Sequence, residues 1–153
     1  MTSTAFRFHH ISLSVADLTT QEDWYRTALG LTRVDERLDM PDAGVRTAVL
    51  SGPGGVRVEF VERSGSTPIT HPDPFSATAT QTFTHLALQV PDLDSAFARL
   101  TGECGARQVS PPAPGVTEGM RYAYVHDPEG NLIELIETSA SAAGKDLDEA
   151  AHA

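Results

Sequence analysis

The sequence predicts an α+β fold made of two tandem βαβββ modules. Sliding the chain by 75 positions aligns residues 8–62 with residues 83–137 without a gap, and 15 of the 55 aligned positions are identical. Unrelated segments of average composition would share roughly 6% of their positions. Each copy begins with apolar residues in period-two alternation, continues with apolar residues at helical spacing, and ends in three more segments typical of strands. The duplication therefore predicts both the fold class and the order of the elements.

Within each copy, local signals set the expected bounds of the elements. Thr19 and Glu22 predict a capping box at the start of the first helix, and Gly30 predicts its end. The second helix is expected to begin after Asp92. Strands are expected over residues 8–15, 31–38, 45–50 and 56–61 in the first copy, and over residues 83–90, 107–110, 121–125 and 131–137 in the second.

These elements predict a single domain with four consecutive parts. A chain of 153 residues is long enough to bury a core of its own. Three prolines among serine and threonine residues mark a linker between the copies, and an alanine-rich end without apolar periodicity marks a tail. The expected parts are a first βαβββ module (6–62), a linker (63–81), a second βαβββ module (82–138) and a flexible tail (139–153).

Charge and cysteine content exclude several classes of function. The formal net charge is −10, whereas a surface for nucleic acid or for an anionic membrane needs clustered Lys and Arg. A single cysteine, Cys104, cannot form an intrachain disulfide or a thiolate zinc cluster. There is no apolar run near the roughly 20 residues of a membrane span and no signal-peptide core in residues 1–10. We therefore expect a cytoplasmic protein that binds neither nucleic acid nor a membrane.

Four residues of metal-ligand type lie at matched positions of the two copies. His10 and Glu59 are 49 positions apart, and so are His85 and Glu134. Strand alternation places each histidine on the sheet face opposite the residues that pack on the helix. A lone strand histidine or glutamate is most often a solvated residue. Both glutamates, however, lie between apolar neighbours, where an unpaired carboxylate is costly.

These four side chains predict one shared metal site. Two neutral imidazoles and two carboxylates balance the charge of a divalent cation. Such mixed nitrogen and oxygen ligands suit Zn, Ni, Fe, Co or Mn without selecting among them.

Other residues are weaker candidates. Arg46 and Arg121 are matched in the repeat and would suit a substrate carboxylate or phosphate, or would pair with the abundant acids. Tyr122 and Tyr124 alternate with Arg121 and are expected to pack with a solvated hydroxyl. The remaining candidates are expected to be inert or solvent-facing: His9, turned away from His10, then His71, His126 and Cys104.

Two motifs resemble those of the vicinal oxygen chelate superfamily, the group of glyoxalase I, bleomycin resistance proteins and extradiol dioxygenases. The first is HISLSVADL at residues 10–18, with Trp24-Tyr25 and Leu29-Gly30-Leu31 after it. The second and more specific one is DPEGNLIEL at residues 127–135, which resembles the closing hairpin of the family. Trp24 stands where members commonly have Phe. The resemblance covers residues 6–138 and implies two modules that curve their sheets into a cup around a metal.

The resemblance also implies a reaction class. Members of the glyoxalase I type draw one His and one Glu from each module, and His10, Glu59, His85 and Glu134 match those positions. It implies isomerisation or epimerisation of a small α-oxo or α-acyl compound through a metal-bound enediolate, with Glu59 and Glu134 as base and acid in either order. A homodimer is expected by analogy. Glutathione is not expected as a co-substrate, because there is no basic cluster for its carboxylates.

Two alternatives remain open at this point. The first is an Fe(II)-dependent dioxygenase of the same superfamily. Such relatives use two His and one Glu, so the fourth residue, Glu59, weighs against it. The second is a protein that binds and sequesters a drug or metabolite, whose relatives generally lack the metal ligands.

Overall fold

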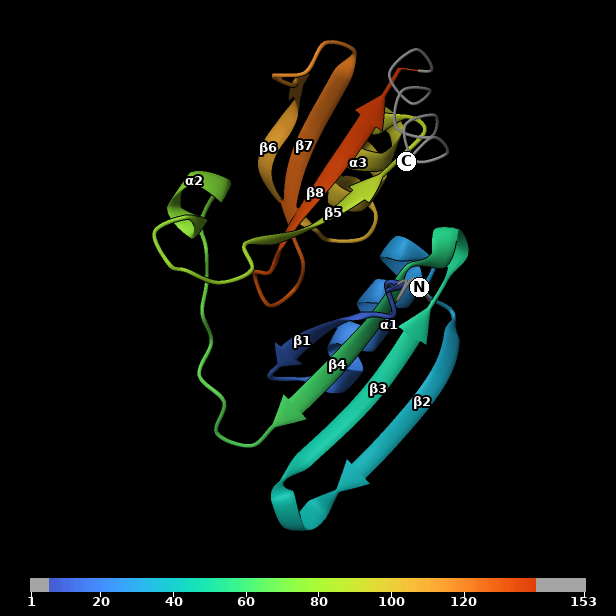
Figure 1. Cartoon of the computed structure of the whole chain (residues 1–153), viewed down its shortest axis with the longest axis vertical. Coiled ribbons are helices and arrows are strands. Elements are labelled where there is room, and N and C mark those ends of the chain that lie inside the picture. Colours follow the sequence, from blue (N-terminus) through green and yellow to red (C-terminus); the bar gives the residue numbers. More distant parts are fainter. Residues whose placement is uncertain (1–5, 140–153) are drawn as a thin grey trace, which may run out of the picture. The chain divides into compact units, whose positions relative to one another are not determined.

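The computed structural model describes residues 6–139, so the predicted tail lies outside the described residues apart from Ser139. The chain divides into two compact units, Met1–Pro68 and Ile69–Ala153. Each unit contains one four-stranded mixed sheet, with the strand orders β1-β4-β3-β2 and β5-β8-β7-β6 (Figure 1). The repeat predicted this α+β arrangement of tandem βαβββ modules, and the structure confirms it.

The first unit packs one helix on one face of its sheet (Figure 1). Strand β1 runs parallel to β4, and the β2–β3 and β3–β4 pairs are antiparallel. Its core joins Tyr25 of the helix to Phe60 of the sheet, both fully buried, with ring centroids 4.8 Å apart. The elements are β1 (Ile11–Val15), α1 (Leu18–Leu29), β2 (Arg33–Met40), η1 (Pro41–Ala43), β3 (Val45–Ser51), η2 (Pro53–Gly55) and β4 (Arg57–Arg63).

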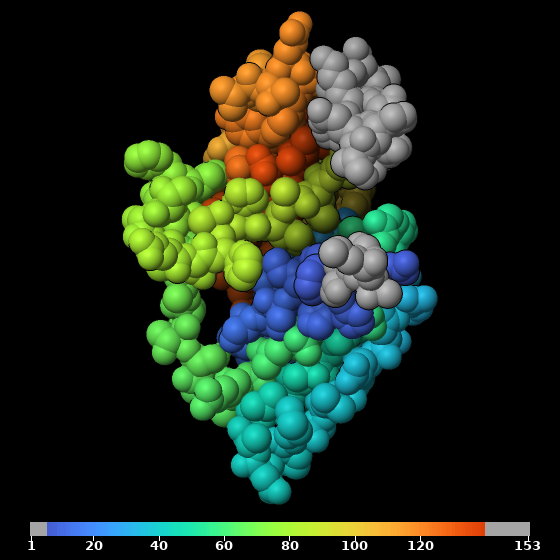
Figure 2. Space-filling view, in the orientation of Figure 1, coloured from blue at the N-terminus to red at the C-terminus, as the bar shows by residue number. Residues whose placement is uncertain are grey.

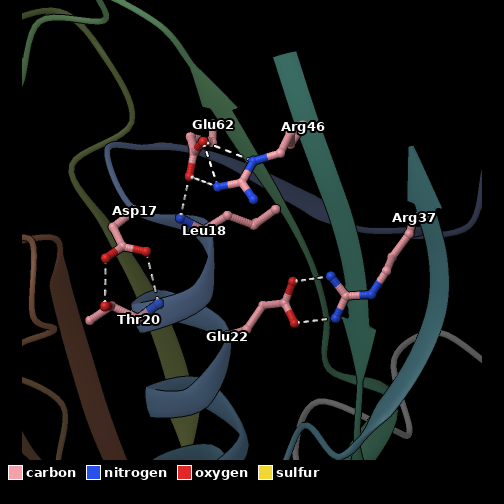
Figure 3. Close-up of polar contacts among 7 residues, drawn as sticks. All are labelled: Asp17, Leu18, Thr20, Glu22, Arg37, Arg46 and Glu62. Atoms are coloured by element: carbon pink, nitrogen blue, oxygen red, sulfur yellow. Dashed lines mark hydrogen bonds and ion pairs between the residues drawn. The ribbon is translucent and has the colours of Figure 1, made fainter. Parts of the chain in front are cut away.

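Helix α1 begins two residues earlier than the capping box predicts. The N-cap is Asp17, whose carboxylate accepts from the backbone N–H and the hydroxyl of Thr20. Glu62 accepts from the backbone N–H of Leu18 at 2.8 Å. Glu22 forms an ion pair with Arg37 across the helix–sheet packing instead of reaching back to the cap (Figure 3). The capping box was therefore wrong, because a charged partner distant in sequence holds Glu22.

The second unit repeats this arrangement. The helix N-cap is Asp92, and Glu137 accepts from the backbone N–H of Leu93 at 2.7 Å, as Glu62 does for Leu18. Strand β7 begins and ends 75 positions after β3, and β8 begins and ends 75 positions after β4. The elements are α2 (Pro74–Ala77), β5 (His85–Gln89), α3 (Leu93–Gly102), β6 (Arg107–Pro114), β7 (Met120–His126) and β8 (Leu132–Thr138).

Part of the predicted linker is an ordered element of the second unit. Asp73 caps the short helix α2, and Ala77 is fully buried against Tyr124 and Leu132 on the second sheet. In the space-filling view the surface around α2 continues into that of the second unit (Figure 2). The second sheet is therefore covered by α3 on one face and partly by α2 on the other.

The predicted closing turn is held by a buried carboxylate. Asp127 is 1% exposed and accepts from the backbone N–H groups of Glu129 and Asn131. It also accepts from the side-chain amide of Asn131 at 2.8 Å. These bonds fix the register of β7 on β8, which decides what lies opposite Glu134.

Candidate metal-binding site

The first module brings His10 and Glu59 together. Strand β1 pairs with β4 in parallel, with Ser12 opposite Glu59, so the histidine just before β1 reaches the start of the same face. His10 Nε2 lies 3.5 Å from Glu59 Oε2, and the two side chains are 33% and 27% exposed. Val58 and Phe60 point to the helix on the other face and are fully buried. The alternation predicted this separation of a polar and an apolar face.

The second module brings His85 and Glu134 together in the same way. Strand β5 begins at His85 and pairs in parallel with β8, with Ala87 opposite Glu134. His85 Nε2 lies 3.1 Å from Glu134 Oε2, and Glu134 is the more shielded of the two glutamates, with 13% of its side chain exposed. The structure therefore shows one His–Glu pair in each module, at repeat-matched positions.

The spacing within each pair suits two ligands of one metal ion. Metal bonds to histidine nitrogen and carboxylate oxygen are about 2.0–2.2 Å long, so two such ligands at tetrahedral or octahedral angles lie roughly 2.8–3.6 Å apart. Both observed separations, 3.1 and 3.5 Å, fall in this range. Within residues 6–139, no group of three or more His, Cys, Asp or Glu is arranged to hold a metal ion. The structure thus provides two separate His–Glu pairs with the donor types that a divalent ion prefers.

Tyr124 adjoins both members of the second pair. It lies directly opposite Glu134 in the β7–β8 ladder. Its ring meets the imidazole of His85 edge-on, with centroids 5.5 Å apart and planes at 90°. Burial and a hydrogen bond from its hydroxyl to the Glu134 carboxylate raise the pKa of Tyr124. Tyr124 was expected only to pack, and its contact with the glutamate was missed.

The second ring nitrogen of each histidine faces the residue before it in the chain. Thr84 Oγ1 lies 2.9 Å from His85 Nδ1. A hydroxyl can donate or accept, so His85 can leave Nε2 free for a metal without losing this bond. In the first module the neighbour is His9, whose Nδ1 lies 2.6 Å from His10 Nδ1. His9 was expected to turn away from His10, and that expectation was wrong, because His9 lies outside β1 and is not held by the strand alternation.

The contacts of His9 set the tautomer of His10. Arg57 donates to His9 Nε2 at 2.5 Å and pairs with Asp35 at 2.8 Å. The proton of neutral His9 is then on Nδ1, so His10 accepts at Nδ1 and carries its own proton on Nε2, the atom that faces Glu59. Metal binding through that atom requires this chain of contacts to rearrange. The donor atoms of both pairs fit a divalent ion, and the second pair fits it as it stands.

The two predicted substrate arginines lie on the helix face of their sheets. Arg46 pairs with Glu62 at 2.7 Å, and these contacts raise the pKa of Arg46 (Figure 3). Arg121 pairs with Asp94 of α3 at 2.8 Å, and that ion pair raises the pKa of Arg121. Neither arginine shares a face with Glu59 or Glu134, because odd and even positions of these strands face opposite sides. The structure brings them to the helix N-termini instead of the His–Glu pairs.

His126 was expected to face solvent, and that expectation was wrong. It is 5% exposed, and its Nε2 lies 2.7 Å from the backbone carbonyl of His71. The linker segment before α2 covers it, and no local sequence signal indicates this contact. His126 therefore fastens this segment to β7 and is not a further ligand candidate.

Comparison with known proteins settles the family. The model of the Glyoxalase/Bleomycin resistance protein/Dioxygenase superfamily matches residues 7–135, which is most of the chain. The chain belongs to this superfamily. A search of the curated proteins found no match.

Solved structures of the superfamily share the fold at low identity. A point variant of glyoxalase I from Zea mays is 25% identical with a TM-score of 0.66, over 85% of this chain and 44% of the maize chain, so this chain spans less than half of that relative. A glyoxylase/bleomycin resistance protein/dioxygenase domain from Frankia sp. EAN1pec is 21% identical with a TM-score of 0.70, over 90% and 95% of the two chains. The trypanothione-dependent glyoxalase I of Leishmania major is 23% identical with a TM-score of 0.69, over 97% and 100%.

Membership of the superfamily accounts for the fold that carries the two His–Glu pairs, and it does not identify the reaction. Its members in these comparisons include glyoxalase I enzymes and proteins described only by family. None of the helices within residues 6–139 is both long and apolar enough to cross a membrane.

Proposed function

We propose that this superfamily member is a metal-dependent enzyme of the glyoxalase I type, which isomerises or epimerises a small α-oxo or α-acyl compound. His10, Glu59, His85 and Glu134 would together hold one divalent ion. The observation that supports this most is the pair of repeat-matched His–Glu contacts, each at the separation of two ligands of one metal.

The proposed chemistry is a proton transfer next to a carbonyl. When bound, a divalent ion polarises the carbonyl and stabilises the negative charge of the enediolate. One of the two glutamates accepts the proton from the α-carbon, and the electron pair of the broken C–H bond moves toward the carbonyl oxygen. In an isomerisation a proton then returns to the neighbouring carbon, and the hydroxyl proton of the first carbon moves to the former carbonyl oxygen. In an epimerisation a proton adds to the other face of the same carbon from a donor on that face.

Solvent exchange tests this proposal without knowledge of the natural substrate. The full chain, loaded with Ni²⁺, Zn²⁺, Co²⁺ or Mn²⁺, is incubated in D₂O with a methylglyoxal hemithioacetal or a 2-methyl-branched acyl thioester as probes. We expect deuterium at the α-carbon, detected by NMR, and its loss on removal of the metal and in the double variant Glu59→Gln/Glu134→Gln.

The alternatives give different results in the same samples. Consumption of dioxygen with Fe²⁺ and no exchange would contradict the proposal in favour of a dioxygenase. Failure to bind any metal, with ligand binding unchanged in Glu59→Ala and Glu134→Ala, would contradict it in favour of a sequestering protein.

The assembly of the enzyme is part of the proposal. We propose a homodimer, as expected from the family resemblance. Sedimentation equilibrium of the full chain would show twice the 16.4 kDa mass of one chain. A mass of one chain at micromolar concentration would contradict this part.

A further inference from the structure

The two His–Glu pairs of the duplicated chain differ in the residue that lies opposite the glutamate on the neighbouring strand. Glu134 faces Tyr124 across the β7–β8 ladder, whereas Glu59 faces Val49 across the β3–β4 ladder. Val49 and Tyr124 are themselves repeat-matched, 75 positions apart. A phenol can donate a hydrogen bond to a carboxylate and a valine cannot. The two copies therefore share the His and Glu residues and differ in the residue opposite the glutamate.

Tyr124 is held firmly enough to act as a support. It is 8% exposed and packs in a cluster with Ala77 of α2 and Leu132 of β8. Its ring edge also meets His85 at 5.5 Å, so one side chain touches both ligands of the second pair. Partners of this kind orient metal ligands and lower the mobility of the side chains that bind the ion.

The first pair has less support. The Glu59 side chain is 27% exposed, twice the fraction of Glu134. Among the described residues, the polar partner of Glu59 is His10, at 3.5 Å. A carboxylate in this setting gives up fewer interactions when it moves from the metal toward a substrate proton.

We propose that Tyr124 is a positioning residue that holds Glu134 as a permanent metal ligand, and that Glu59 is therefore the carboxylate that takes the proton from the substrate. This inference rests on the proposed function and assigns separate roles to its two glutamates. In the first step Glu59 forms the new O–H bond while the α-carbon loses its C–H bond and its electron pair moves to the carbonyl oxygen. The proton on Glu59 exchanges with solvent. In an isomerisation Glu59 then gives a proton to the neighbouring carbon while the hydroxyl proton of the α-carbon moves to the former carbonyl oxygen; in an epimerisation a proton from solvent adds to the opposite face of the α-carbon.

The affinity for metal tests the role of Tyr124. Ni²⁺ is titrated by calorimetry into the metal-free full chain, wild type, Tyr124→Phe and Tyr122→Phe. Tyr122 is the matched control, because it lies two positions away on the same face and its ring packs on that of Tyr124 at 5.8 Å. We expect Tyr124→Phe to weaken Ni²⁺ binding on the order of 10-fold to 100-fold and Tyr122→Phe to leave it unchanged. Equal affinities of the two variants would overturn the positioning role.

The glutamates test the division of roles independently of Tyr124. We expect Glu134→Gln to lose more Ni²⁺ affinity than Glu59→Gln. At saturating Ni²⁺, we expect Glu59→Gln to lose deuterium exchange into the probe, whereas Glu134→Gln retains part of it. The opposite order in either measurement overturns the assignment. Absence of Ni²⁺ binding by the wild type would instead overturn the proposed function, so the two failures are distinguishable.

Discussion

At the scale of single residues, the repeat predicted the candidate metal ligands but not the residues that contact them, such as Tyr124. His10, Glu59, His85 and Glu134 could be predicted because a residue matched in both copies is recognised by its spacing. Tyr124 could have been found as well. The hairpin that turns around Glu129 places Tyr124 and Glu134 at equal distances from its centre. The ion pair of Glu22 with Arg37 has no such local signal, so the capping box was wrong there.

The helix caps predict how stability depends on pH. Hydrogen bonds from the hydroxyl and backbone of Thr20 lower the pKa of Asp17, and those from the backbone and hydroxyl of Ser95 lower the pKa of Asp92. The folded state therefore binds these protons less well than the unfolded state. The contribution of the caps is fully present above their ordinary value of 3.8 and is lost as the pH falls below it through the folded pKa.

Chemical unfolding of the single and double variants Asp17→Asn and Asp92→Asn checks this. We expect both single variants to lower the free energy of unfolding at pH 6, and the double variant to show a weaker fall between pH 5 and pH 3 than the wild type. An unchanged pH profile in the double variant would contradict the assignment of these two carboxylates.

Glu59 and Glu62 lie on opposite faces of β4, so their substitution is expected to affect different properties, metal binding and stability. The backbone N–H of Leu18 and the guanidinium of Arg46 lower the pKa of Glu62, which therefore stabilises the fold at neutral pH. We expect Glu62→Gln to lower the free energy of unfolding by about 1–2 kcal/mol, because it weakens charge-assisted hydrogen bonds at the helix N-terminus. We expect it to leave Ni²⁺ affinity unchanged, whereas Glu59→Gln, three positions away on the other face, weakens Ni²⁺ binding. Calorimetric titration of both variants measures this, and a loss of affinity in Glu62→Gln would contradict the face assignment.

At the scale of elements, the alternation and the glycine-rich turns predicted the sheets, and contacts distant in sequence corrected the details. Helix α1 ends at Gly30, which adopts φ +70° as the expected stop requires. Helix α2 was missed inside the linker, although Asp73 followed by Pro74 is a typical helix start. A helix of four residues has no apolar periodicity of its own. It forms because Ala77 packs on the second sheet.

The β3–β4 turn predicts a contrast between two glycines. Gly54 has φ +69°, and a Cβ added there meets nothing within 4 Å. Gly52 has an extended backbone, but a Cβ there would lie 2.6 Å from the carbonyl oxygen of Gly30, where the turn packs on the end of α1. We expect Gly54→Ala to cost about 1–2 kcal/mol from backbone strain, and Gly52→Ala to cost up to about 3 kcal/mol from the clash. Urea unfolding of the two variants measures the difference, and equal stabilities would show that the end of α1 gives way.

At the scale of the whole molecule, the sequence predicted the family and the two-module plan, and the family model and the structure confirm both. The shared use of four ligands by one ion remains a proposal, because each pair belongs to a separate compact unit. Internal symmetry predicts equivalent ligands and cannot predict the unequal support that Tyr124 and Val49 give them. That difference lies at a matched position where the two copies are not identical, so the repeat pattern does not include it.

The most direct test of a jointly held ion is the Ni²⁺ stoichiometry and affinity of the full chain when one pair is removed at a time. The wild type, the double variant His10→Ala/Glu59→Ala and the double variant His85→Ala/Glu134→Ala are titrated by calorimetry, with metal content measured after dialysis. The account predicts one ion per chain in the wild type and a severe loss of affinity in both double variants, larger when the His85 pair is removed. Two ions per chain, or wild-type affinity in either double variant, would contradict it.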